Sequence, residues 1–114
     1  MTNTFLNNLR QKNNERQKLW TGAEKVDVLF RAVEFAGEAG EVANAVKKVY
    51  RAQNGIVGNN KDINDLMENL VEEIGDVLIT IDLLANEYGI DLEHAVKTKF
   101  NKTSNKVSIP VFME

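Results

Sequence analysis

Two short acidic segments of this sequence have residue types and a spacing that suit the binding of a metal ion. The pentapeptide EAGEV begins at Glu38, and EIGDV begins at Glu73. Residues three apart lie on one face of a helix, so Glu38 pairs with Glu41 and Glu73 pairs with Asp76. The chain has no cysteine, and oxygen donors alone favour hard cations such as Mg²⁺, with Mn²⁺ able to replace it.

The positions of the two pairs in the chain predict that they meet in a helical hairpin. Glu41 precedes Ala52 by 11 residues, and Glu73 follows Asp62 by 11 residues, where Ala52 and Asp62 flank the predicted connection. At about 1.5 Å per residue, both pairs lie about 16 Å from that connection. An antiparallel arrangement therefore places four carboxylates side by side.

Four ionised carboxylates in one patch repel one another and need cations or raised pKa values. A divalent metal that keeps open positions accepts phosphate oxygens, which predicts a phosphorylated substrate. The alternative is a solvated acidic helix face with lysine partners. Against this alternative, no lysine follows any of the four acids by four residues, and apolar residues flank both pairs.

The elements that must position these acids are helices, because apolar residues recur at spacings of three and four throughout the body of the chain. We therefore predict an all-α fold, a four-helix bundle in which two long antiparallel helices carry the acidic site. Residues 1–114 are expected to form one domain with a core at about 24–106. The predicted helices cover about 2–18, 24–52, 62–88 and 91–106, with a break at 20–24 and a C-terminal tail at about 107–114.

Composition excludes several classes of function. The net charge of −3 argues against a partner that is a polymeric nucleic acid, since such binding depends on neutralising phosphates with basic residues. No apolar run is long enough to cross a bilayer, and the N-terminal sequence lacks the apolar block of a signal peptide. We expect a cytoplasmic protein that does not bind membranes.

Other residues fit a substrate less specifically. Lys47 and Lys48 extend the stripe of Glu41 and could hold a phosphate, although two solvated lysines near a helix C-terminus explain them equally well. Trp20 could stack on a base, but a single tryptophan is more often a core or interface anchor.

A stripe of small residues, Ala36, Gly40 and Ala43, lies on the back of the second predicted helix, and Gly75 is placed likewise on the third. Glycine inside a helix costs about 1 kcal/mol relative to alanine, which suggests a steric need there. We expect another helix to approach this stripe, either the first or the fourth helix of the same chain or a helix of a second copy. A homodimer or a homotetramer is expected.

Three segments resemble the MazG-like all-α nucleoside triphosphate pyrophosphohydrolases, especially the short stand-alone proteins of bacteria and their phages. They read EFAGEAGEVANAVKK, LVEEIGDVLITIDLLANEYGIDLEHAV and KFNKTSNK, and together they cover about 34–106. The resemblance implies Mg²⁺-dependent hydrolysis of ribo- or deoxynucleoside triphosphates to the monophosphate and pyrophosphate. Glu38, Glu41, Glu73 and Asp76 match the metal ligands of the family.

The resemblance also implies roles for residues outside the two acidic pairs. Glu72 assists in taking the proton from the attacking water, and Lys99, Asn101 and Lys102 contact the substrate. Gly37 replaces the first glutamate of the family's fuller EExxE motif. The compartment is the cytoplasm of a bacterium, or of the host cell if the protein is encoded by a phage. Two alternatives stay open: a phosphoribosyl-ATP pyrophosphohydrolase, and a non-enzymatic metal-binding helical interaction module.

Overall fold

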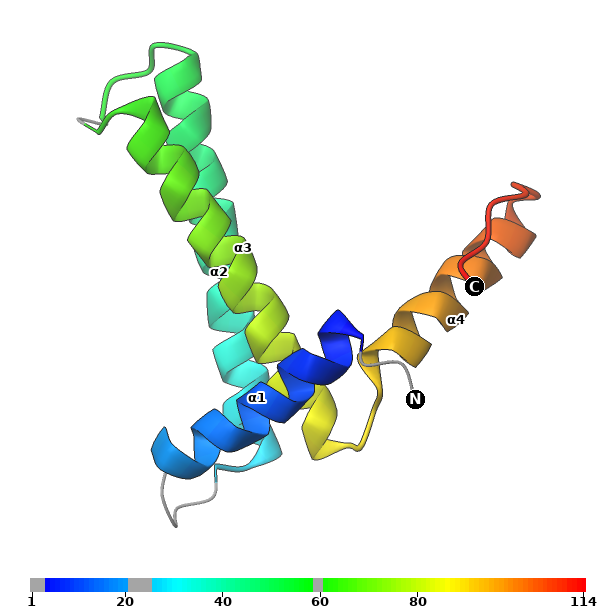
Figure 1. Ribbon diagram of the computed structural model, residues 1–114. Helices are drawn as coiled ribbons and strands as arrows, with labels where there is room; N and C mark the ends of the chain where they lie inside the picture. Colours follow the sequence, from blue (N-terminus) through cyan, green and yellow to red (C-terminus); the bar gives the residue numbers. More distant parts are fainter. Residues whose placement is uncertain (1–3, 21–25, 59–60) are drawn as a thin grey trace.

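The computed structural model describes residues 4–20, 26–58 and 61–114. Within these ranges the chain forms helices and no strands, which confirms the all-α prediction (Figure 1). The helices are α1 (Phe5–Trp20), α2 (Val28–Gln53), α3 (Ile63–Glu87) and α4 (Leu92–Lys106). The predicted start of the second helix at residue 24 and most of the predicted break before it lie outside the described residues. The prediction is wrong for Val26 and Asp27, which precede α2 and are not helical, since Asp27 is its N-cap.

Local sequence sets the ends of the helices. The carboxylate of Asp27 accepts a hydrogen bond from the backbone N–H of Phe30 at 2.9 Å and caps α2. Asp91 caps α4 in the same way through the N–H of Glu93, as predicted. Gly89 follows the end of α3 with a φ of +64°, a left-handed conformation that glycine adopts without strain. These caps fix where the long helices begin and end.

The helices α2 and α3 run antiparallel along each other and form the main helix pair of the structure (Figure 1). The buried apolar side chains Ala45 and Val49 of α2 and Leu66 and Leu83 of α3 belong to this hairpin. The predicted pair of long antiparallel helices is therefore confirmed. None of the helices in the described ranges is both long enough and apolar enough to cross a membrane.

The helix α1 crosses α3 near its C-terminal end (Figure 1), and polar side chains hold it there. Asp82 of α3 is only 1% exposed. Its carboxylate accepts hydrogen bonds from Nε of Arg10 and from Nδ2 of Asn13, both at 3.0 Å. Further along α1, the side chain of Gln17 accepts a hydrogen bond from Arg31 of α2 at 3.0 Å. A buried polar network thus joins α1 to the hairpin.

The helix α4 points away from the hairpin and packs closely against none of the other described helices (Figure 1). The radius of gyration is 17.7 Å, compared with about 13 Å for a compact chain of this length. Large apolar side chains are exposed on every helix; on the hairpin they include Leu29, Val33, Val46, Val71 and Ile74. A single chain therefore leaves much of its apolar surface uncovered.

The small-residue stripe faces solvent. A Cβ atom added at Gly40 or at Gly75 would meet no other atom within 4 Å, and Ala36 and Ala43 are exposed. Of the two expected alternatives, a helix of the same chain does not pack on this stripe, because α1 lies across α3 and α4 points away from the hairpin. That a helix of a second copy packs there stays a prediction.

A candidate metal centre between α2 and α3

Three carboxylates from two helices converge in the hairpin. Oxygen atoms of Glu38 from α2 and of Glu73 and Asp76 from α3 lie within 4.8 Å of one another. We call these three residues the acidic group. Glu38 and Glu73 are half-buried and Asp76 is exposed, so the group is open to solvent on one side. A set of carboxylate oxygens that is open to solvent on one side fits a hard divalent cation that keeps some of its waters.

The carboxylates of the acidic group and its neighbours repel one another. Burial raises the pKa of Glu38 above its ordinary value, and the nearby carboxylates of Asp76, Glu73, Glu41 and Glu34 raise it further. Both causes disfavour the ionised form of Glu38. A bound cation would remove this repulsion, so the electrostatics of the group favour a cation in it.

The raised pKa of Glu38 leads to a pH-dependent effect on stability. The folded protein binds this proton more tightly than the unfolded chain, so the ionised carboxylate destabilises the fold. The cost is absent below the ordinary carboxyl pKa of about 4.3 and sets in as the pH rises through the raised pKa. In EDTA, Glu38→Gln is therefore expected to be more stable than the wild type at pH 8 and no more stable at pH 4. Urea unfolding at both pH values measures the difference.

The matched control for this experiment is Glu68→Gln, which removes an exposed carboxylate of α3 that lies outside the acidic group. The control variant is expected to lack the pH-dependent gain. If Glu38→Gln is as stable as the wild type, or less stable, at pH 8, the repulsion argument is wrong.

The other two predicted acids lie beside the group. Glu41 is exposed and is not one of the three residues whose oxygens converge, although its charge contributes to the raised pKa of Glu38. Glu72 is exposed and directly precedes Glu73 in α3. The structure thus brings together one member of the first predicted pair and both members of the second.

The sequence did not predict the buried arginine of α2, Arg31. Arg31 is 5% exposed, and its Nη1 donates to Oε1 of Glu34 at 3.0 Å. Glu34 lies one helical turn before Glu38 and adds to the raised pKa of that residue. The i, i+3 spacing of arginine and glutamate was a signal for this ion pair, but only the position of α1 shows that the arginine is buried.

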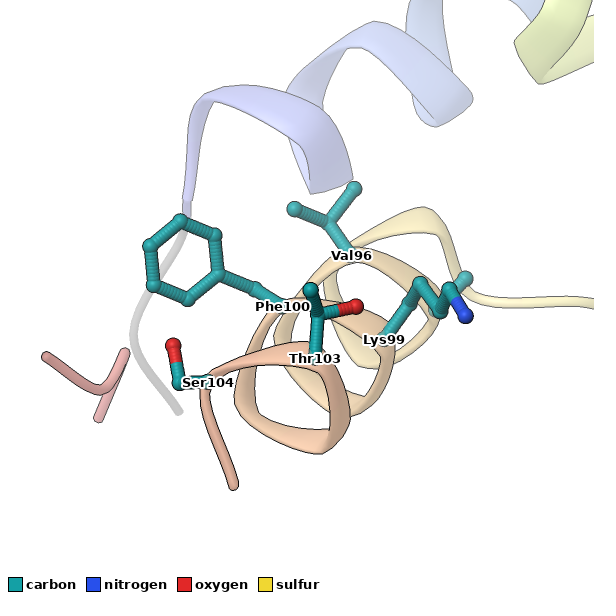
Figure 2. A pocket seen from close by; sticks show the side chains of 6 residues that line it. Val96, Lys99, Phe100, Thr103 and Ser104 are labelled. Carbon is teal, nitrogen blue, oxygen red and sulfur yellow. The ribbon is translucent and has the colours of Figure 1, made fainter. Parts of the chain in front are cut away.

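The predicted basic residues lie on two different helices, α2 and α4. Lys47 and Lys48 are further along α2, where Lys47 is exposed and Lys48 is half-buried. Lys99 and Lys102 are on α4, which points away from the hairpin of its own chain. Lys99 lines an apolar groove of about 530 Å³ together with Val96, Phe100 and Thr103 (Figure 2).

Asn101 and Trp20 have local partners. The side chain of Asn101 donates to the carbonyl of Met113 at 2.9 Å and accepts from its N–H at 2.7 Å. It thereby holds the C-terminal tail against α4. Trp20 ends α1 and is 73% exposed, and the guanidinium of Arg16 lies over its ring, 5.7 Å from the centroid.

Comparison with known proteins points to one family. The sequence model of the MazG nucleotide pyrophosphohydrolase domain matches residues 27–107, a range that includes the whole acidic group. The chain is also similar to the Gene 37 protein of Mycobacterium phage L5, with 35% identity over 70 residues. That alignment covers 61% of this chain and 57% of the phage protein, so the chain spans just over half the length of this relative. No solved structure matches the chain.

Proposed function

We propose, because this chain belongs to the MazG nucleotide pyrophosphohydrolase family, that it hydrolyses ribo- or deoxynucleoside triphosphates to the monophosphate and pyrophosphate. The observation that carries this proposal is the convergence of Glu38, Glu73 and Asp76 within the segment that matches the family. We further propose Mg²⁺ as the cofactor, with Mn²⁺ able to replace it.

The three residues of the acidic group would hold the cation, and Glu41 lies close enough in the sequence of α2 to join them by a change of side-chain conformation. The donor set is made of carboxylates, which suits Mg²⁺ better than a metal that prefers nitrogen or sulfur. When bound, such a cation neutralises phosphate charge and makes a bound water more acidic.

A side chain of the protein would accept the proton that the attacking water loses. The water oxygen forms a bond to the α phosphorus, and the bond from that phosphorus to the α–β bridging oxygen breaks. Pyrophosphate leaves with the bonding electron pair. The proton of the water goes to a carboxylate, for which we propose Glu41 or Glu72, because both are exposed and are close in sequence to members of the acidic group.

We propose that the working protein is at least a homodimer and that its site uses two copies of the chain. The large radius of gyration and the exposed apolar side chains of the hairpin support assembly. Lys99 and Lys102 lie on a helix that points away from the acids of the same chain. If these lysines contact the triphosphate, they therefore do so at the acidic group of a second copy.

Mixing two inactive variants tests this arrangement. Chains with Asp76→Asn and chains with Lys99→Ala, unfolded together and refolded, are expected to regain about a quarter of the wild-type activity. Half of the randomly formed dimers contain both variants, and one of the two sites in each of these is intact. Steady-state hydrolysis rates measure the recovery.

The control is the same mixture without refolding, which should stay inactive while the subunits do not exchange. A refolded mixture that remains as inactive as its two components contradicts a site shared between copies.

The proposed reaction is tested with a panel of common ribo- and deoxynucleoside triphosphates, each with Mg²⁺, with Mn²⁺ or with EDTA. We expect metal-dependent formation of the monophosphate and pyrophosphate. Release of the diphosphate and phosphate, or turnover that persists in EDTA, would refute the proposed reaction. If no member of the panel is turned over, phosphoribosyl-ATP is the next substrate to assay.

A further inference from the structure

A second pocket lies where α1 crosses α3. It has a volume of about 400 Å³, which is within the usual range for sites that bind small molecules. Its apolar lining comes from Leu9 and Leu19 of α1 and Ile79 of α3. The polar side chains that line it are Lys12, Asn13, Glu15 and Arg16. We call this feature the α1–α3 pocket.

The pocket is adjacent to the acidic group because of its position on α3. Ile79 follows Asp76 by three residues, and both belong to α3. Side chains three residues apart on a helix are neighbours, with about 5–6 Å between their Cβ atoms. A molecule that occupies the pocket therefore lies close to a group bound at the carboxylates.

The charged side chains that line the pocket are two cations, Lys12 and Arg16, and one carboxylate, Glu15. Lys12 forms an exposed ion pair with Glu15 at 3.2 Å. Arg16 has no carboxylate partner among the described residues; its observed partner is the ring of Trp20. The pocket thus has one cation whose charge is not compensated, next to an apolar surface. A nucleobase has a flat face that packs against apolar side chains and on which a guanidinium stacks, so it matches both features.

We infer that the α1–α3 pocket binds the nucleoside part of the substrate, with the base against Leu9 and Ile79 and with the guanidinium of Arg16 against the base. This inference rests on the proposed function, since it assigns a place to the base of the same nucleotide whose phosphates reach the acidic group. A guanidinium can stack on flat rings, and that of Arg16 already lies over the ring of Trp20.

Trp20 gives a direct test of binding, because the chain contains one tryptophan and the guanidinium of Arg16 lies over its ring. The probes are α,β-methylene analogues of nucleoside triphosphates with the four RNA bases, which resist cleavage at the α–β bridge, and inorganic tripolyphosphate, which has no base. In Mg²⁺, at least one nucleoside analogue is expected to change the fluorescence of Trp20 in a saturable way. Tripolyphosphate is expected to leave the fluorescence unchanged.

Charge reversal at the pocket supplies the second arm of the test. Arg16→Glu is expected to weaken binding of the analogue, and to raise KM for the triphosphate, by about tenfold or more, while kcat changes by less than about threefold. The matched control is Lys18→Glu, which reverses an exposed charge of α1 that does not line the pocket. This control is expected to change either quantity by less than about twofold.

Several results would overturn the inference while leaving the proposed reaction intact. One is an equal fluorescence response to tripolyphosphate and to the nucleoside analogues. Others are equal effects of Arg16→Glu and Lys18→Glu, or the absence of any response from a protein that hydrolyses triphosphates. Conversely, selective binding of an analogue by a protein without turnover would support the pocket and count against the proposed hydrolysis.

Discussion

Asp76→Asn is expected to lower kcat/KM for nucleoside triphosphate hydrolysis by more than about a hundredfold, because replacing even an outer-shell partner of a metal ligand commonly costs about 10- to 100-fold. The substitution keeps the shape of the side chain but removes the charge that Asp76 contributes to the acidic group. Asp76 is exposed, so the fold should survive. Steady-state kinetics measure the loss of kcat/KM. Calorimetric titration with Mg²⁺ or Mn²⁺ measures the loss of metal affinity that we also expect.

The matched control is Glu68→Gln, a neutral replacement of an exposed acid on the same helix that lies outside the acidic group. It should keep both metal affinity and activity within about twofold. Far-UV circular dichroism of both variants checks that the helices are intact. Full activity of Asp76→Asn would remove Asp76 from the proposed metal ligands.

Glu41→Gln tests whether Glu41 is a metal ligand, as the sequence motif predicts, or lies outside the metal site, as in the structure. The spacing of the motif makes Glu41 a ligand equal to Glu38, whereas the structure places it outside the convergent group. If Glu41 acts on the proton and does not hold the cation, Glu41→Gln lowers kcat and leaves the affinity for the metal nearly unchanged.

Arg10→Met is expected to destabilise the folded protein by about 3 kcal/mol, because it leaves the buried carboxylate of Asp82 without its cation. Asp82 then keeps only the hydrogen bond from Asn13 in the network described above. Arg10 also donates to the carbonyl of Ile90 at 2.7 Å, so the junction between α3 and α4 loses a contact as well. Urea unfolding at one fixed protein concentration measures the change, since assembly makes stability depend on concentration.

Two further variants show whether the loss comes from the buried carboxylate. Lys97→Met removes the cation of a more exposed pair, with Glu93 at 3.9 Å, and should cost less than about 1 kcal/mol. The double variant Arg10→Met with Asp82→Leu removes both charges and is expected to be more stable than Arg10→Met alone. A double variant that is less stable than the single one would show that the cost does not come from an unpaired buried charge.

The sequence alone determined the helical class, several helix ends and the meeting of the two acidic motifs. These features depend on local rules: the three-to-four spacing of apolar residues, aspartate at the starts of helices and glycine after α3. Counting residues from the connection to Glu41 and to Glu73 predicted that all four acids meet, because a helix has a fixed rise; three of the four, Glu38, Glu73 and Asp76, converge in the structure. The resemblance to the family likewise rests on short segments that can be recognised in the sequence alone.

Only the tertiary structure decided which side chains are buried and which acids converge. Asp82 interrupts an apolar stretch in the sequence, and its role depends on Arg10 and Asn13, which lie 72 and 69 residues away along the chain. The burial of Arg31 and the formation of the α1–α3 pocket likewise follow from the angle at which α1 crosses the hairpin. Periodicity shows which face of a helix is apolar, but it contains no information about which distant helix covers that face, because packing between distant segments is set by the whole chain.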